Sequence, residues 1–476
     1  MRKVTVFVFC ALAAAFSPVG EALSQAIDLN KINKIPRYST MSEADFKAKS
    51  KEFSEVPQGD LYLEYSIRLR DGWQKLGLTD DERKAVAKET APKVTSTDPY
   101  DIGNLRDQKI VDDKNNIVRD DSGEEIEPEE LEVQDGNMLS KRMQRNRDMV
   151  IPKDSDVRLL GPVARYVGPA NLLAPSRLEI SSMQLNHDIT TRNWFLNYIL
   201  SRNYTLTGME QVGDNRVDAE YVLIDKGISY VVRTAAVSNG RRMVLVSYFV
   251  PEKFWEKEKE FQEMSINSFQ FLKPEKTVID DKKTHGFLDL VKFTYPNAWK
   301  LIAPNVYSVD NMTAKLLYST DAVTLQGEID INLISTELDT TLMKEVEYIR
   351  QDLKKRGLNI GEALDTNTTY TFGSKITFSR VEAYTIKGEK KDYIDYEFWL
   401  AIMAEDRYYY IVTMLTPGRS SDFYTWARNT ETFGTVIQSL QPQSAGETLD
   451  ANFLRKVQGT DSGGGAVAPD AKAKEE

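Results

Sequence analysis

The chain is almost free of cysteine, since Cys10 is the only one among its 476 residues. If the N-terminal segment is removed on export, the mature chain has no thiol, and disulfides, thiolate catalysis and cysteine-ligated zinc are all excluded. The fold must then be held together by its apolar core. Periplasmic proteins of bacteria often lack disulfides, whereas extracellular animal domains commonly depend on them, so the absence favours a bacterial envelope.

The sequence also lacks an apolar run long enough to cross a membrane. The apolar run 4–16 is shorter than the ~20 residues that a spanning helix needs. Two basic residues precede it, and a proline, a glycine and small residues follow. This pattern predicts a signal peptide over residues 1–26, cleaved after Ala26, and a periplasmic or secreted protein with no transmembrane span in the mature chain. A retained anchor is the alternative, and lipidation of Cys10 is disfavoured because Phe9 precedes it.

Histidine is rare, and the usual catalytic motifs are missing. Neither His187 nor His285 is accompanied by a G-x-S-x-G motif or a second histidine, so a helix-capping or surface role is expected for both. The glycines 463–465 lack the Lys-Ser/Thr of a phosphate-binding loop, and the acidic stretch 112–135 lacks the calcium-loop spacing. The sequence therefore assigns no catalytic, cofactor-binding or metal-ligating residue, and no cofactor.

Positive charge is in deficit, with 61 Lys and Arg against 72 Asp and Glu, which gives a net charge of -11. Binding to nucleic acid or anionic lipid relies on clustered basic residues, and no basic stripe is present. With 41% hydrophobic and 10% aromatic residues, the composition is that of a globular protein with an acidic surface. Nucleic acid is therefore excluded as a partner.

Two tryptophan-containing segments are alike. Residues 61–76 and 288–301 each alternate apolar and polar side chains, turn at Asp-Gly or Pro-Asn, and then place a Trp, Trp73 or Trp299. Alternation predicts a strand, and the Trp can cover a core. The same order of elements follows each Trp. In the first half we predict a strand at 178–185, a helix at 189–202 and strands at 219–224, 229–236 and 243–249. In the second half we predict a strand at 329–334, a helix at 338–356 and strands at 375–386, 393–404 and 407–415.

The two halves of the sequence are most alike at their C-terminal ends. Tyr248-Phe-Val-Pro251 leads into a helix that finishes in Ser268-Phe269, and Met414-Leu-Thr-Pro417 leads into one that finishes in Ser439-Leu440. In both, a strand meets a proline that cannot continue the ladder, and a helix packs back on the sheet. The sequence thus predicts two copies of one α+β domain.

This order of elements resembles the PsbP-like sandwich domains, named for an extrinsic subunit of photosystem II. The resemblance covers about 57–272 and 284–442, and it is closest at Tyr295-Pro-Asn-Ala-Trp299 and Tyr410 to Pro417. The first copy departs from it, with Arg70-Asp-Gly-Trp73 in place of the proline-containing turn. The resemblance implies an α+β fold in which each antiparallel sheet is packed with helices. The family has no shared catalytic residues, so it implies no site.

The predicted organisation follows from these copies. A polar, acidic insertion interrupts the first copy, and it cannot bury enough apolar area to offset the entropy cost of ordering. The predicted parts are a signal peptide at 1–26, an N-terminal linker at 27–56, domain 1 at 57–275 with a flexible insertion at about 78–157, domain 2 at 276–445 and a disordered tail at 446–476.

The favoured function is a non-catalytic binding or scaffold protein with protein partners in the envelope, for example an accessory component of a secretion or conjugation apparatus. One alternative is a periplasmic hydrolase of cell-wall or glycan substrates, which requires two carboxylates in one concave pocket. The other is a small-ligand binder with a pocket between sheet and helix. The sequence leaves the oligomeric state open.

Overall fold

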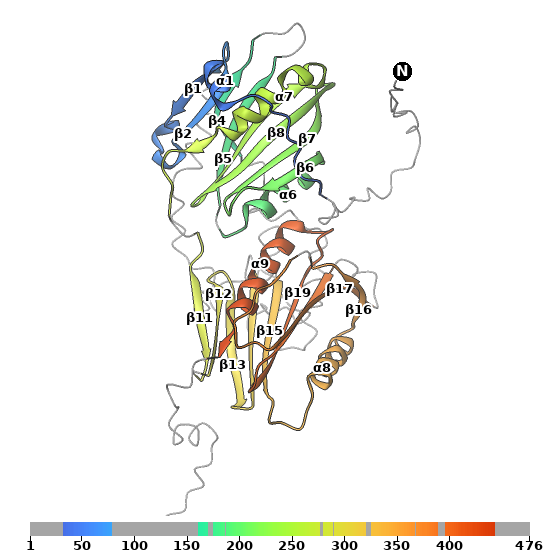
Figure 1. The fold of residues 1–476 in the computed structure, drawn as a ribbon. Helices are drawn as coiled ribbons and strands as arrows, with labels where there is room; N and C mark the ends of the chain where they lie inside the picture. Colours follow the sequence, from blue (N-terminus) through green and yellow to red (C-terminus); the bar gives the residue numbers. More distant parts are fainter. Residues whose placement is uncertain are drawn as a thin grey trace, which may run out of the picture.

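A computed structural model of the chain describes residues 32–78, 160–169, 175–185, 187–276, 279–288, 290–319, 325–366, 368–388 and 396–442 (Figure 1). The predicted signal peptide, the C-terminal tail and all but the first residue of the predicted insertion lie outside these residues. None of the described helices is both long enough and apolar enough to cross a membrane.

Two large antiparallel sheets carry the fold, and they have the same strand order. In unit 1 the order is β3-β4-β5-β9-β8-β7-β6, and in unit 2 it is β13-β14-β15-β19-β18-β17-β16. The strands of unit 1 are β3 (Gln74–Leu76), β4 (Gly161–Val167), β5 (Arg177–Gln184), β6 (Thr205–Gln211), β7 (Arg216–Asp225), β8 (Ile228–Asn239) and β9 (Arg242–Pro251). Those of unit 2 are β13 (Lys300–Ser308), β14 (Asn311–Ser319), β15 (Leu325–Ser335), β16 (Leu358–Leu364), β17 (Phe378–Gly388), β18 (Tyr396–Ala404) and β19 (Tyr408–Pro417).

Each unit also has a small three-stranded sheet. Its order is β1-β2-β10 in unit 1 and β11-β12-β20 in unit 2. The strands are β1 (Ser50–Glu55), β2 (Tyr65–Arg70), β10 (Gln270–Phe271), β11 (Lys282–Phe287), β12 (Val291–Pro296) and β20 (Gln441–Pro442). Two short 3-10 turns, Pro57–Gly59 and Leu61–Leu63, connect β1 to β2.

The helices lie on both faces of the large sheets (Figure 1). They are α1 (Glu43–Ala48), α6 (Thr191–Ser201), α7 (Glu252–Asn267), α8 (Leu342–Lys355) and α9 (Phe423–Ser439). In unit 1, Ile266 of α7 packs with the small sheet on one face, and Phe195 of α6 packs on the other. In unit 2, α9 occupies the face that corresponds to α7, and Val346 of α8 packs on the opposite face. The predicted end of α8 is seen at Gly357, whose φ of 77° suits glycine.

The two units correspond residue by residue where the last helix ends. The Ser268 hydroxyl accepts a hydrogen bond from the amide of Arg68 in β2 at 2.9 Å. The Ser439 hydroxyl accepts one from the amide of Thr294 in β12 at 2.8 Å. Each serine thus fixes the helix end to the middle strand of its small sheet. Because these anchors coincide, positions in α7 and α9 can be compared by counting back from them.

The fold class predicted from the sequence, α+β with a helix-packed sheet in each domain, is wrong. Of the described residues, 48% lie in strands and 23% in helices, so the protein is mostly antiparallel β. The prediction overlooked strands whose burial pattern is weak. In β6 only two adjacent residues, Gly208 and Met209, are buried, so its side chains show no alternation. The prediction also overlooked β14, although its alternation is clear, with Met312, Leu316 and Tyr318 buried.

The predicted N-terminal linker, 27–56, also differs from the structure. Its described part contains α1 and β1, and β1 pairs antiparallel with β2 along its whole length. Phe46 of α1 is buried against Phe261 of α7, with ring centroids 6.2 Å apart. Residues 32–56 are therefore a folded part of unit 1.

Candidate functional site

The two units meet where the start of α6 lies against α9, and one apolar cluster contains residues of both. Thr190 caps α6, since its hydroxyl accepts from the Asn193 amide at 3.3 Å. The same hydroxyl donates to Glu431 of α9 at 2.6 Å, and the Thr190 amide donates to it at 3.1 Å. The Asn193 side-chain amide adds a third bond of 2.6 Å. A single carboxylate of unit 2 thus holds the first turn of α6 in unit 1.

His187 lies in this contact and not on the surface, contrary to expectation. It is 5% exposed, and its Nε2 is 2.6 Å from the hydroxyl of Tyr424. Burial, and then the positive charge of Arg428, lower its pKa well below 6.5, so the ring is neutral near pH 7. His285 is elsewhere, half-buried on β11 with its ring edge-on to Phe293. Only one of the two histidines therefore belongs to the unit contact.

A cavity of about 390 Å³ opens beside this contact. Residues of both units line it, from the start of α6, from α9, from the chain entering β11 and from the loop after β16. Its charged and aromatic lining includes Asp188, Arg192, Asp280, Tyr370, Arg428 and Glu431. The volume falls within the range of about 300–1,000 Å³ typical of small-molecule sites. This cavity is the candidate functional site.

Three carboxylates line the cavity, and the pKa of each is raised. For Asp188, Asp280 and Glu431 the main cause is burial, which disfavours the charged form. The charge of Asp188 raises the pKa of Asp280 further, because two negative charges close together repel each other. Backbone amides oppose this effect: Asp188 accepts from the amide of Asp280, and Asp280 accepts from Asn297 and Ala298.

Two arginines line the same cavity. Arg428 is 9% exposed, and its Nη1 donates to the hydroxyl of Tyr318, but its buried Nε has no hydrogen-bond partner in the part of the chain that the structure describes. Burial lowers the pKa of Arg192. Among the described residues no ion pair within 4.0 Å joins either arginine to Asp188, Asp280 or Glu431. The cavity therefore holds charges of both signs that do not neutralise each other by direct contact.

The wall behind the cavity is fixed by Glu397 of β18. This carboxylate accepts hydrogen bonds from the indole nitrogens of Trp399 and Trp426, at 3.1 and 2.8 Å. It also pairs with Arg419, which donates from Nε at 2.7 Å and from Nη2 at 2.9 Å. Both tryptophans line the cavity and are almost fully buried. Glu397 thus sets the orientation of two large rings, which gives the site a rigid side.

Of the residues that line the cavity, the sequence singled out Trp299, as a residue that covers the core and not as part of a site. It also singled out His187, the neighbour of Asp188. Asp188 and Asp280 belong to different units, and only the packing of the units brings them together. One signal was available, because Glu260 and Glu431 hold the same position before Ser268 and Ser439. Over the described residues, no group of three or more His, Cys, Asp and Glu side chains is placed to hold a metal ion.

Comparison with known proteins does not add to these observations. No protein-family model matches the chain, and no curated protein matches it either. The resemblance to PsbP-like domains stays a prediction.

Proposed function

We propose that the chain is a non-catalytic binding protein that holds a small zwitterionic ligand in the cavity between its two units. One observation carries the proposal: two arginines and three carboxylates line one cavity without pairing directly with each other. Burying charge is costly unless it is paired and hydrogen-bonded. A ligand with one positive and one negative group would supply both missing partners.

The charged groups that line the cavity offer two kinds of partner. Asp188 and Asp280 both have raised pKa values, and the charge of Asp188 contributes to that of Asp280, so an ammonium group placed between them would favour their charged forms. Glu431 already accepts hydrogen bonds from Thr190 and Asn193, so we assign it a structural role and not a contact with the ligand. A carboxylate or similar anion would suit the guanidinium groups, which bind planar anions through paired N–H donors. Free amino acids and short peptides fit this description.

The setting that we propose is the bacterial envelope, on the basis of the predicted signal peptide and the thiol-free mature chain. There the two units would act as a rigid holder for the ligand, with protein partners in an envelope assembly. The proposal of protein partners and of the envelope setting is supported by the sequence alone, whereas the proposed class of ligand is supported by the lining of the cavity.

Isothermal titration calorimetry with free amino acids and dipeptides tests the proposal. Methyl esters and N-acetyl derivatives of the same compounds serve as matched ligands that lack one charge. We expect binding by the zwitterions and a loss of about tenfold or more for each derivative, the usual size of a lost charged hydrogen bond. Binding that is indifferent to both modifications would contradict the proposal.

Variants locate the binding. Arg192→Gln removes a guanidinium from the cavity and should weaken zwitterion binding, whereas Lys283→Gln changes an exposed residue of β11 outside the cavity lining and should not. Loss of binding in both variants would place the ligand elsewhere.

A hydrolase is the second candidate, because Asp188 and Asp280 line one cavity and a raised pKa, which both have, is what a general acid requires. Turnover of oligosaccharides or peptides that disappears in Asp188→Asn and in Asp280→Asn would favour it over binding alone. Turnover that survives both substitutions would exclude this pair.

A further inference from the structure

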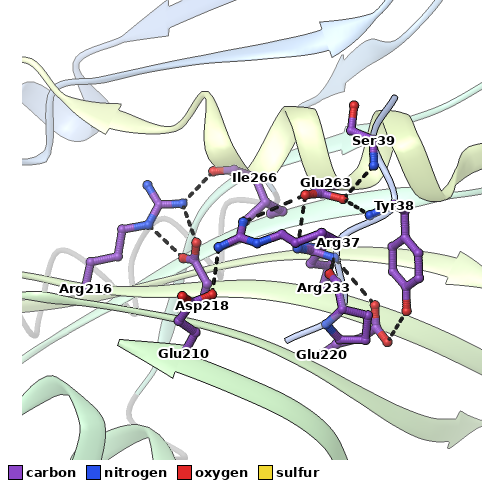
Figure 2. A network of polar contacts seen from close by, with 11 residues as sticks. Arg37, Tyr38, Ser39, Glu210, Arg216, Asp218, Glu220, Arg233, Glu263 and Ile266 are labelled. Atoms are coloured by element: carbon purple, nitrogen blue, oxygen red, sulfur yellow. Dashed lines mark hydrogen bonds and ion pairs between the residues drawn. The ribbon is translucent and has the colours of Figure 1, made fainter. Parts of the chain in front are cut away.

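A second site lies in unit 1, where residues 33–40 run as an extended segment between α7 and strands β6 to β8; we name it the strap (Figure 2). Two of its carbonyls accept hydrogen bonds: Asn33 from the Met209 amide at 2.9 Å, and Pro36 from Nη1 of Arg233 at 3.0 Å. Ile35 is 4% exposed. The strap therefore lies in a groove in the manner of a bound peptide.

Two glutamates of α7 hold the backbone of the strap from the other side. Glu263 accepts from the consecutive amides of Tyr38 and Ser39, at 2.6 and 3.0 Å. Glu260 accepts from Thr40, through its hydroxyl at 2.9 Å and its amide at 3.4 Å. These contacts are made mainly to main-chain groups, which any extended chain presents. They would hold a peptide of another sequence in the same way.

Side chains add selectivity to this groove. Arg37 pairs with Glu210 at 2.7 Å and lies 3.8 Å from Glu263. The Tyr38 ring packs edge-on against Trp255, at 5.1 Å between centroids. Its hydroxyl donates to Glu220 at 3.0 Å. The groove thus accommodates a basic residue followed by an aromatic one, Arg37 and Tyr38 of the chain itself.

The floor of the groove consists of buried charges (Figure 2). Arg233 is fully buried, and it lies 3.7 Å from both Glu220 and Glu263. Its Nε and Nη2 have no hydrogen-bond partner among the described residues. With the strap removed, one arginine would face two carboxylates. Arg37 of the strap supplies the second positive charge.

Unit 2 shows that the fold does not require these charges. In the strand register, Trp399 of unit 2 stands where Arg233 stands in unit 1, and its partner across the strands is Ala383 in place of Glu220. Gly434 corresponds to Glu263, and the ring of Tyr370 lies so close that a Cβ on Gly434 would be 3.1 Å from it. In unit 2 these positions thus carry aromatic side chains and a glycine in place of charges, and Trp399, Tyr370 and Gly434 line the open cavity of the candidate site.

We propose that the groove of unit 1 is a peptide-binding site for an extended partner segment that carries a basic residue followed by an aromatic one, and that the strap is its built-in competitor. Replacing buried ion pairs with apolar residues is often neutral or stabilising, so stability alone does not account for Arg233, Glu220 and Glu263. Recognition of an exchangeable chain accounts for them. Main-chain hydrogen bonds provide the attachment and two side chains provide the selectivity.

The test uses the full chain with its own strap weakened. In Arg37→Ala/Tyr38→Ala the groove is intact but the competitor has lost both selective side chains. A labelled synthetic peptide of residues 32–41 is titrated into this variant and into the unchanged chain, with fluorescence anisotropy as the readout. We expect binding about tenfold or more tighter to the variant, because the strap no longer competes, and a similar loss when the peptide carries the same two alanines.

A second substitution separates the groove from other surfaces. Glu263→Gln, added to the weakened-strap chain, should remove most of the peptide binding, whereas Glu252→Gln in the exposed first turn of α7 should not. Circular dichroism checks that each chain is folded, and Arg37→Ala alone replaces the double variant if that one unfolds. A folded weakened-strap chain that fails to bind, or that binds the doubly substituted peptide equally well, overturns the proposal.

Discussion

Thr190 donates both its backbone amide and its hydroxyl to Glu431 across the contact between the two units, at 3.1 and 2.6 Å. Thr40 makes the same pair of bonds to Glu260 within unit 1, at 3.4 and 2.9 Å. Glu260 and Glu431 occupy corresponding positions in α7 and α9. Each unit thus offers one helix glutamate to an incoming threonine. In unit 2 the threonine comes from the neighbouring unit, and in unit 1 it comes from the strap.

Glu431→Ala should loosen the unit contact. It removes the acceptor of the Thr190 hydroxyl and amide and of the Asn193 side chain, and because Thr190 is exposed and Asn193 half-buried, each lost bond should cost about 1 kcal/mol. In differential scanning calorimetry the units should then unfold in separate transitions or at a lower Tm. Glu260→Ala is the matched control, since it removes the equivalent contact to the strap alone. An unchanged single transition for Glu431→Ala would show that this carboxylate does not hold the units together.

Acid should weaken the same contact through His187. Its pKa is lowered in the folded state, so as pH falls below 6.5 the unfolded chain takes up a proton that the folded chain refuses. Stability is therefore lost over that range. Asp188, Asp280 and Glu431 act in the opposite sense, because their raised pKa values favour the folded state as pH falls.

The His187 contribution can be isolated. His187→Gln cannot titrate, so its Tm should fall less than that of the unchanged chain between about pH 7.5 and 5.5. Tyr424→Phe removes the hydrogen bond to the ring and keeps the titrating group, and it should retain the pH dependence. Equal pH dependence in the His187→Gln and unchanged chains would assign the effect to other groups.

Glu397→Ala should be among the most destabilising single changes. It leaves Arg419, 17% exposed in its side chain, without its partner, and it releases the indole nitrogens of Trp399 and Trp426. Removing one member of a buried pair costs about 3–5 kcal/mol. Urea denaturation followed by tryptophan fluorescence measures the loss. Glu382→Ala, whose partner Arg380 is 65% exposed, is the control and should change stability little. Similar midpoints for the two variants would contradict this account.

The sequence predicted the repeated order of elements because β5 and β15, and the prolines at the ends of β9 and β19, carry strong local signals. It did not predict the strap. An extended segment that is held mainly through its backbone has no periodic pattern of side chains, so residues 32–40 were predicted to be part of a linker.

The cavity could not be predicted for a different reason. Asp188 and Asp280 meet only because α6 of unit 1 packs on α9 of unit 2, and no local pattern encodes that docking. His187 looked like a surface residue for the same reason, since its burial depends on Tyr424 of the other unit. Glu260 of α7 and Glu431 of α9 did give a signal in the sequence, because they hold equivalent positions in the two copies. Equivalent positions in a duplicated sequence often keep equivalent contacts.

Gly208→Ala should displace the strap, although the substituted residue takes part in none of the charged contacts that hold it. A Cβ at this position of β6 would lie 2.9 Å from both the Cα of Ile35 and the carbonyl oxygen of Lys34, closer than a real Cβ approaches backbone atoms. Because backbone on both sides cannot yield easily, the strap must move outward. Trypsin should then cleave faster after Lys34 and Arg37, which digestion followed by mass spectrometry measures. Gly77→Ala, where an added Cβ meets nothing within 4 Å, should leave the cleavage rate unchanged. Equal rates in both variants would show that the strap is not held by its close approach to β6, and that the contacts to Glu260 and Glu263 suffice to keep it in place.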